Sequence, residues 1–286
     1  MTLPTPHEFG AVDAREILST PQVTDDKYSR GVVGFVTGSK EYPGAAVLGV
    51  NAAYRTGVGL VRYVGPRSVG KLVLQRRPEV VLGAGRTQAW VIGSGISALT
   101  GTGDTGASIR FALDSGVPIV LDAGALNVVT ELGAERNVII TPHIAELSRL
   151  MIFLTGRETE WSIDMITADP LAAAGRVADE LGVVVSLKGH VTHIAAPVTG
   201  DVRTVFQVTS PTTWLATAGT GDVLAGMMGT IVATTDPTSQ AELARCAATA
   251  VYLHGCAANR ASAGGPIAGL DVSEEIPSVI REVLTA

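Results

Sequence analysis

Positive charge, cysteine and long apolar segments are all scarce in this sequence, and each shortage excludes a class of protein. The 286 residues include 21 lysines and arginines against 27 acidic residues, a formal net charge of −6 with no basic cluster, so we expect no nucleic-acid partner. No apolar run reaches the roughly 18 residues of a membrane span, so we expect no membrane partner. The first residues lack the basic and apolar blocks of a secretory signal, which predicts a cytoplasmic protein.

Cysteine is limited to Cys246 and Cys256, which lie in one stretch of helical spacing. Both fit a reducing compartment, and no second pair completes a metal-binding set, so we expect two buried thiols and no metal held by the protein. Three catalytic motifs are also absent: Walker A, His-Glu-x-x-His and Gly-x-Ser-x-Gly. Their absence excludes the P-loop, zincin and esterase classes of protein.

Hydrophobic residues, by contrast, make up 46% of the chain and charged ones only 17%, which predicts an extensive core. Runs rich in Val and Ile alternate with longer Ala- and Leu-rich segments of helical spacing. This is typical of an α/β fold with a mostly parallel central sheet flanked by helices on both faces, and we predict one domain over residues 1–286. The predicted strands are Val32–Thr37, Leu60–Val64, Val80–Leu82, Ala89–Ile92, Pro118–Leu121, Val138–Ile140, Val183–Leu187 and His193–Ala196. The predicted helices are Gly44–Thr56, Thr105–Ser115, Ala145–Leu150, Pro170–Leu181, Asp222–Ala233, Ala241–Asn259 and Asp271–Leu284.

Several predicted strands end in glycine or in a polar cluster. In an open α/β sheet the ligand crevice lies beyond the carboxyl ends of the strands, so we expect these clusters to converge in space. The clusters are Thr37-Gly38-Ser39, Gly93-Ser94-Gly95, Asp122-Ala123-Gly124, Thr141-Pro142-His143 and Lys188-Gly189-His190.

Asp222 is the only ionisable residue between Arg203 and Asp236, and it follows the turn Gly219-Thr220-Gly221 directly. Glycines leave backbone N–H groups unshielded, and the apolar run that follows predicts a helix whose positive end faces the turn, a combination suited to phosphate. A carboxylate beside a phosphate is suited to take a proton from an attacking hydroxyl. The motif therefore predicts phosphoryl transfer to an alcohol, with helix capping by Asp222 as the alternative.

Two further strand-end motifs have a functional and a structural interpretation. Leu187–Ile194 is typical of a short hairpin. In the functional interpretation, Lys188 reaches nucleotide phosphates and Gly189 lets the nucleotide approach the backbone closely. In the structural interpretation, Lys188 is a solvated turn residue. His143 follows a strand and precedes a helix, where it is either an acid–base or hydrogen-bonding group at the crevice or a helix-starting residue with Glu146 in the first turn. The pattern leaves both choices open.

A dinucleotide fingerprint is only partly present. Gly93-Ser94-Gly95 follows a predicted strand, but the full Gly-x-Gly-x-x-Gly is not met and no acidic residue stands at the ribose position, which disfavours a hydride-transferring Rossmann enzyme. Gly101-Thr102-Gly103-Asp104 repeats the letters of the Asp222 motif ahead of a shorter, more polar helix, and we set it aside.

Taken in order, the motifs of this chain resemble those of the ADP-dependent NAD(P)H-hydrate dehydratases, which belong to the ribokinase-like superfamily. The resemblance runs from about Lys27 through Val251–Gly255 and beyond, with no sign of the epimerase domain to which some relatives are fused. The motifs that carry it are Pro43-Gly44-Ala45-Ala46, Gly93-Ser94-Gly95, Leu121–Leu126, Thr141-Pro142-His143, Leu187–Thr192 and Leu215–Leu224.

The resemblance implies a ribokinase-like fold and repair of the S form of NADH hydrate and NADPH hydrate, in which water has added to the dihydronicotinamide ring. ADP would phosphorylate the ring hydroxyl, and loss of phosphate would restore NAD(P)H with AMP and phosphate as co-products. Asp222 would be the base, and the amides of Gly219 and Gly221 would stabilise the phosphoryl group. By motif match the AMP site comprises Lys188, Gly189, His190, Val191, Thr192 and Gly221. The hydrate site comprises Ala45 or Ala46, Gly95, His143 and Asp222.

The resemblance also implies a Mg²⁺ ion on the diphosphate of ADP rather than in a protein cage, and a homo-oligomer such as a tetramer. The sequence departs from the family pattern at Ser210–Trp214, where many relatives carry Gly-Asn, and at Ser94, where proline is frequent; we expect both at the edge of the site. Two other functions compete. One is an ATP-dependent kinase of the same superfamily that acts on a vitamin-like hydroxymethyl compound, and the other is a nucleotide sensor without catalysis.

Overall fold

The computed structural model describes residues 4–96, 103–132, 137–200 and 202–286. Within these residues ten strands form one sheet in the order β1-β10-β9-β8-β7-β6-β5-β2-β3-β4. Neighbours from β8 to β4 run parallel, β9 is antiparallel to both β8 and β10, and β1 is parallel to β10. The strands are β1 (His7–Glu8), β2 (Val32–Val36), β3 (Leu60–Tyr63), β4 (Val81–Leu82), β5 (Ala89–Ile92), β6 (Ile119–Leu121), β7 (Val138–Ile140), β8 (Val184–Leu187), β9 (Val191–Ala195) and β10 (Val205–Thr209).

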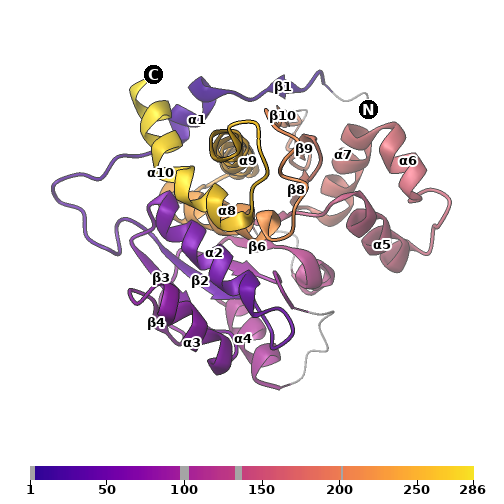
Figure 1. Cartoon of the computed structure of the whole chain (residues 1–286). Helices are drawn as coiled ribbons and strands as arrows, with labels where there is room; N and C mark the ends of the chain where they lie inside the picture. The colour runs from indigo at the N-terminus through magenta and orange to yellow at the C-terminus, as the bar shows by residue number, and fades with distance from the viewer. Residues whose placement is uncertain (1–3, 97–102, 133–136, 201) are drawn as a thin grey trace.

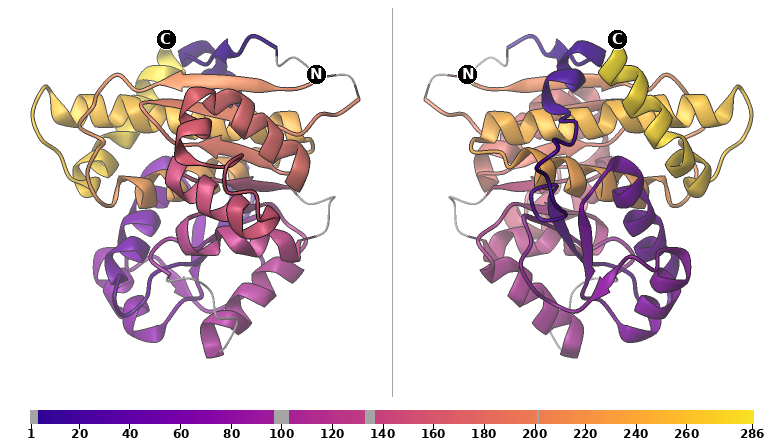
Figure 2. Two further views of the ribbon diagram at one scale, coloured as in Figure 1. Left: turned by 90° about the vertical axis from the view of Figure 1, so that its right-hand side faces the viewer. Right: turned by 90° about the vertical axis from the view of Figure 1, so that its left-hand side faces the viewer.

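Helices cover both faces of this sheet, as the sequence predicts (Figures 1 and 2). They are α1 (Ala11–Ile17), α2 (Pro43–Thr56), α3 (Arg67–Arg76), α4 (Gly103–Asp114), the 3₁₀ helix η1 (Ala123–Glu131), α5 (Ile144–Thr155), α6 (Ile163–Ala168), α7 (Pro170–Leu181), α8 (Thr220–Thr235), α9 (Gln240–Ser262) and α10 (Gly269–Thr285). None of the helices in the described ranges is both long and apolar enough to cross a membrane.

The buried side chains form two clusters, one on each face of the sheet. Alternate residues of a strand point to opposite faces, so Val91 of β5 packs with α2, α8, α9 and α10, while Trp90 and Ile92 pack with α4, η1, α5 and α7. Strands buried on both faces have to be apolar throughout, which is why the parallel strands appear in the sequence as unbroken Val and Ile runs.

All eight predicted strands and all seven predicted helices are present, with ends that differ by a few residues. The largest differences are in α5, which continues five residues past Leu150 to the left-handed Gly156, and in β9, which begins at Val191 rather than His193. The structure adds β1, β10, α1, α3, α6 and η1. Two-residue β1 has no apolar periodicity that could reveal it, whereas α3 was not predicted although Val69, Leu72 and Val73 have helical spacing. In the motif Gly101-Thr102-Gly103-Asp104, Gly101 and Thr102 lie outside the described residues.

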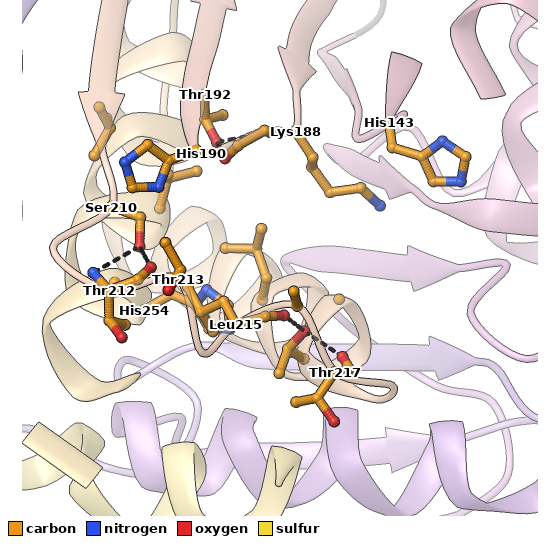
Figure 3. Close-up of a pocket in the computed structure, with 18 of the residues that line it drawn as sticks. His143, Lys188, His190, Thr192, Ser210, Thr212, Thr213, Leu215, Thr217 and His254 are labelled. Atoms are coloured by element: carbon orange, nitrogen blue, oxygen red, sulfur yellow. Dashed lines mark hydrogen bonds between the residues drawn. The ribbon is translucent and has the colours of Figure 1, made fainter. Parts of the chain in front are cut away.

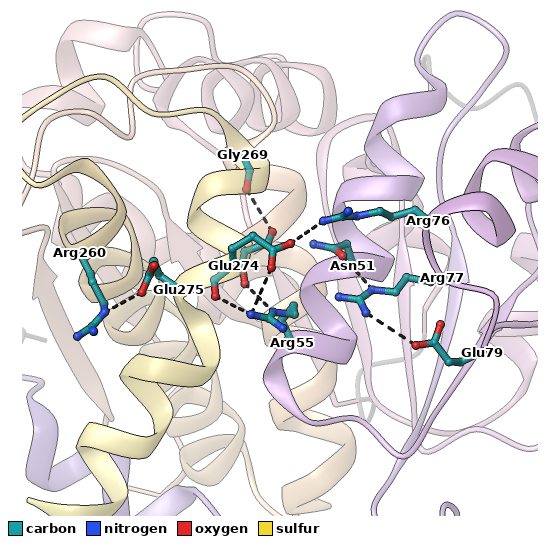
Figure 4. Close-up of polar contacts among 10 residues, drawn as sticks. Asn51, Arg55, Arg76, Arg77, Glu79, Arg260, Gly269, Glu274 and Glu275 are labelled. Carbon is teal, nitrogen blue, oxygen red and sulfur yellow. Dashed lines mark hydrogen bonds and ion pairs between the residues drawn. The ribbon is translucent and has the colours of Figure 1, made fainter.

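The carboxyl-terminal helix α10 is tied to α2 and α3 by an exposed ionic network, drawn in Figure 4. Arg55 of α2 and Arg76 of α3 both pair with the carboxylate of Glu274 in α10, and Arg55 also donates to the backbone carbonyl of Glu274 at 2.7 Å. This network lies away from the carboxyl ends of the strands, and its role is to anchor α10.

Candidate active site

Asp222 lies in the first turn of α8, a helix that begins at a half-buried glycine without a side-chain cap. Gly219 is the N-cap residue, with a left-handed φ of 90°, and no side chain caps the helix. The first N–H groups of a helix lack intrahelical acceptors, so this end offers amide donors and the positive end of the dipole to an anion. The alternative in which Asp222 caps the helix is therefore wrong, since Asp222 is the third residue of α8.

The position of Asp222 is fixed by a close crossing of α8 with α2. A Cβ added to Gly226 would lie 2.1 Å from the carbonyl oxygen of Gly49, and one added to Gly49 would lie 3.2 Å from the carbonyl oxygen of Asp222. Glycine at position 226 is required for the two backbones to approach this closely, and a side chain at position 49 would also be tightly packed. The apolar Gly- and Ala-rich sequence of both helices thus sets where the carboxylate stands.

The Asp222 carboxyl group is suited to proton transfer near neutral pH. Burial, together with the negative charge of Asp122, raises its pKa to about 6, and the nearby Lys188 ammonium opposes this shift. A general base works best when its pKa lies near the operating pH. Asp222 is thus a candidate base at the mouth of an anion site.

The strand-end clusters do converge, and the residue that joins them is Asp122. Its side chain follows β6 and is buried, with Ser94 Oγ donating to Oδ2 at 2.8 Å, Thr141 Oγ1 donating to Oδ1 at 2.7 Å and Lys188 Nζ donating to Oδ1 at 2.8 Å. Backbone atoms extend the network, because the Gly38 N–H donates to the carbonyl of Ser94 at 2.7 Å. Sequence reasoning gave Asp122 no role. The available signal was a carboxylate directly after a fully buried strand.

Lys188 is not a solvated turn lysine. It follows β8 in the β8–β9 hairpin, which the sequence predicts correctly, and its ammonium also lies 3.8 Å from Glu146. Although burial lowers the pKa of Lys188, the carboxylates of Asp122 and Glu146 outweigh it and raise the pKa above its usual value. The ammonium nitrogen is 3.9 Å from where a Cβ of Gly221 would stand, so a positive charge adjoins the start of α8.

His143 starts a helix with Glu146 in the first turn, as one of its two sequence interpretations predicts. It is the N-cap of α5, where its Nδ1 accepts from the Glu146 N–H at 3.2 Å and the Glu146 carboxylate accepts from the His143 N–H at 2.8 Å, a reciprocal capping box. It also lines the cavity beside Lys188.

A cavity of about 750 Å³ opens over the start of α8, between the β8–β9 hairpin, the segment before α8, and α9. In Figure 3, Lys188 and His143 lie on one side of it, and His190, Ser210 and Thr212 lie on the other. Of the residues predicted for the AMP site, the cavity brings together Lys188, Gly189, His190, Thr192 and Gly221, whereas Val191 is absent from its lining.

The remaining predicted hydrate-site residues lie beside the β2 and β5 ends. A Cβ on Gly95 would stand 2.5 Å from the Cβ of Ala45 and 3.2 Å from the Cα of Gly38, so these three residues are in contact. Ala46 is fully buried against Gly38, while Ala45 retains 8% exposure, which favours Ala45 over Ala46 as a ligand contact.

Both departures from the family pattern adjoin the site more closely than the sequence predicts. Ser94 is 2% exposed and belongs to the Asp122 network instead of the site's edge. Ser210, Thr212 and Thr213 form part of the cavity wall, beside Gly255 of α9. A Cβ on Gly255 would lie 3.1 Å from Pro211, and this close packing explains why position 255 is a glycine.

His254 is a cavity residue to which sequence reasoning gave no role. It is 6% exposed, and burial lowers its pKa to about 4, with a backbone hydrogen bond to Thr220 acting in the opposite direction. The imidazole is therefore neutral at physiological pH and forms an uncharged wall of the cavity.

The described residues gather no group of three or more His, Cys, Asp or Glu side chains that could hold a metal ion.

Comparison with known proteins places these features in a family. A family model described as NAD(P)H-hydrate dehydratase matches residues 33–277. The bifunctional NAD(P)H-hydrate repair enzyme Nnr of Mycobacterium tuberculosis is 39% identical over 244 residues, which are 82% of this chain and 47% of that protein. The chain thus spans about half the length of that relative.

A relative of similar length is the ADP-dependent (S)-NAD(P)H-hydrate dehydratase of Neisseria meningitidis serogroup B, which is 32% identical over 87% of this chain and 83% of that protein. Among solved structures, the ADP/ATP-dependent NAD(P)H-hydrate dehydratase of Bacillus subtilis, co-crystallised with ATP/Mg²⁺, superposes with a TM-score of 0.83. It is 25% identical and the match covers 97% of this chain and 99% of that one.

Proposed function

The chain belongs to the NAD(P)H-hydrate dehydratase family, and from that premise we propose that it uses ADP to convert the S forms of NADH hydrate and NADPH hydrate back to NADH and NADPH. The observation that carries the proposal is the juxtaposition of the Asp222 carboxyl group with the uncapped start of α8 and the Lys188 ammonium. A base, an anion site and a fixed cation are the parts that phosphoryl transfer to an alcohol requires.

In the proposed reaction, the ring hydroxyl of the hydrate attacks the β-phosphorus of ADP while Asp222 accepts the hydroxyl proton. The bond between the β-phosphorus and its bridging oxygen breaks, and AMP leaves. The phosphorylated ring carbon then loses phosphate as an adjacent ring carbon loses a proton, which restores the carbon–carbon double bond. AMP, phosphate and the reduced dinucleotide are the products, so atoms and charge balance without an oxidant.

The chain's own residues supply positioning and electrostatics. The amides of Gly219 and Gly221 would donate to the phosphoryl oxygens, where charge develops in the transition state. Lys188 would neutralise the diphosphate, with Gly189, His190 and Thr192 of the hairpin holding AMP. Ala45, Gly95 and His143 would contact the hydrate on the other side of Asp222.

Magnesium would enter as part of the MgADP substrate. An ion held by diphosphate oxygens and water suits the reluctance of Mg²⁺ to shed its water. Bound in this way, the ion would neutralise charge on the transferring group.

We also propose that residues 1–286 act as one domain in a cytoplasmic homo-oligomer such as a tetramer. The single sheet supports one domain. Apolar side chains exposed on α5 and α6, namely Phe153, Ile163 and Met165, support a contact with another copy. Light scattering on the purified protein tests the oligomer directly.

A product analysis separates this function from its rivals. With NADH hydrate and MgADP, chromatography should find AMP, inorganic phosphate and NADH in equal amounts. With MgATP and a vitamin-like hydroxymethyl compound supplied instead, an ATP-dependent kinase would release a stable phosphorylated product, and a sensor would consume no nucleotide with either pair of substrates. Either of those outcomes with folded protein contradicts the proposal.

A further inference from the structure

The buried carboxylate of Asp122 stands at a strained turn. The residue after it, Ala123, has a left-handed φ of 47°, and a Cβ on the adjoining Gly93 would lie 1.9 Å from the Asp122 carbonyl oxygen. A non-glycine residue in this conformation is sparsely populated and persists where the surroundings enforce it, often at functional sites. The strained turn therefore indicates a functional role for the buried carboxylate.

Each of the three side-chain hydrogen bonds to this carboxylate comes from the end of another strand. Ser94 follows β5, Thr141 follows β7 and Lys188 follows β8, and each donates a hydrogen bond to Asp122. A buried ionised carboxylate is costly unless it is paired and hydrogen-bonded. Here burial raises the pKa of Asp122, but the Lys188 charge and the three hydrogen bonds outweigh burial, and the net pKa is lower than usual.

The pair restricts Lys188, a side chain that is otherwise flexible. An ammonium on four rotatable bonds can reach many positions, but the 2.8 Å contact with Asp122 Oδ1 holds it beside Gly221. A cation fixed before the nucleotide arrives costs no ordering entropy when the diphosphate binds.

The same negative charge acts on the candidate base. The charged groups that influence the Asp222 carboxyl group are Asp122 beyond β6 and Lys188 beyond β8, and their effects are opposite. Glu146 of α5 acts on Lys188, while His254 of α9 is neutral and adds no charge. Removal of the Asp122 charge would leave burial alone to oppose the attraction of Lys188, so Asp222 would bind its proton less tightly.

We propose that Asp122 is a positioning residue of this active site, which fixes the Lys188 ammonium at the start of α8 and sets the balance of charge that acts on Asp222. The proposal deepens the proposed function and rests on it for the identity of the substrate. Asp122 itself does not touch the reacting atoms.

The test is a titration that needs no substrate. Carboxyl carbon NMR on ¹³C-labelled protein, with the Asp222 signal assigned from Asp222→Asn, gives the midpoint of Asp222 in the wild type and in Asp122→Asn. We expect the midpoint to fall by roughly one pH unit in Asp122→Asn. Ser94→Ala is the matched control, because it removes one hydrogen bond but retains the charge and the lysine pair, and its midpoint should stay at the wild-type value.

An unchanged midpoint in folded Asp122→Asn would overturn the proposal, whatever the enzyme does with substrate. Asp122→Ser removes the same charge with a smaller side chain and replaces the asparagine variant if that variant does not fold. Turnover adds a second readout: Asp122→Asn should raise the KM for ADP at least tenfold and extend activity to lower pH. Recovery of wild-type kinetics on addition of excess Mg²⁺ would assign Asp122 to the metal and contradict the positioning role.

Absence of turnover in the wild type, with the midpoint shift intact, would remove the proposed function and leave the electrostatic relationship in place. The two failures are thus distinguishable.

Discussion

The side-chain nitrogen of Lys188 lies 2.8 Å from Oδ1 of Asp122, although 66 positions separate the two residues in the sequence. The contact joins the ends of two parallel strands with β7 between them. It places one positive and one negative charge at the point where α8 begins, and the behaviour of the site depends on both.

The first prediction concerns this pair. Lys188→Met should lower the free energy of unfolding by about 2–3 kcal/mol, because it leaves the buried Asp122 carboxylate without its partner. The double variant Lys188→Met/Asp122→Asn should recover most of that loss, since no charge then remains to be compensated. Urea unfolding of the wild type, Lys188→Met, Asp122→Asn and the double variant measures the effect. Equal losses in Lys188→Met and the double variant would contradict it.

The second prediction is a stability gain in Asp222→Asn. The folded-state pKa of Asp222 is raised from 3.8 to about 6, so the folded state binds the proton more tightly and this group lowers stability as the pH rises through that window. At pH 7–8 the free energy of unfolding of the variant should therefore exceed that of the wild type by at most about 3 kcal/mol. This limit follows from about 1.36 kcal/mol per unit of pKa difference between the folded and unfolded states. Below pH 4 the two should coincide. A pH-independent difference would contradict this cause.

The third prediction concerns the pH dependence of turnover. Because Asp222 has to be ionised to accept a proton, kcat should fall tenfold per pH unit below about pH 6. A kcat profile from pH 5 to 8 at saturating MgADP and hydrate measures it. Constant kcat down to pH 5 would mean that another group, or none, takes the proton.

The fourth prediction tests the crossing of α2 and α8. A methyl group on Gly226 meets the Gly49 carbonyl at 2.1 Å, so Gly226→Ala should destabilise the protein by about 2 kcal/mol and reduce activity through displacement of Asp222. Gly44→Ala, also in this helix pair, is the matched control, since no atom lies within 4 Å of its added Cβ. It should retain or slightly increase stability. Equal effects of the two substitutions in urea unfolding would show that the crossing is not tight.

The fifth prediction sets the magnitude of the α10 network. Glu274→Gln removes the charge shared by Arg55 and Arg76, but the groups are partly exposed, so we expect a loss below about 1 kcal/mol that shrinks at high salt. A loss of several kcal/mol, unaffected by salt, would contradict the expectation.

The sequence revealed the parallel strands because each is buried on both faces and is therefore apolar throughout, as in β5, β6 and β7. It also predicted that the polar strand ends meet, since parallel strands carry their carboxyl ends to the same edge of a sheet. The sequence analysis did not predict strand β10 at Val205–Thr209, although its β-branched residues favour a strand. It also did not predict two-residue β1, which has no such pattern.

The role of Asp122 was not predictable in the same way. Its partners Ser94, Thr141 and Lys188 are 28, 19 and 66 positions away, and which of the converging polar groups touch depends on side-chain packing that no local pattern encodes. Asp222 was identified because its signal is local: a glycine turn, a carboxylate and an apolar helix in sequence.

The most direct test of the account follows the absorbance of the reduced nicotinamide ring when the purified protein meets NADH hydrate with MgADP, with MgATP or without nucleotide, alongside Asp222→Asn. We predict a rise that requires MgADP and is lost in Asp222→Asn, while the variant remains folded and binds ADP. Absence of a rise with any nucleotide in folded wild-type protein, or an undiminished rise in Asp222→Asn, would contradict phosphoryl transfer with Asp222 as the base.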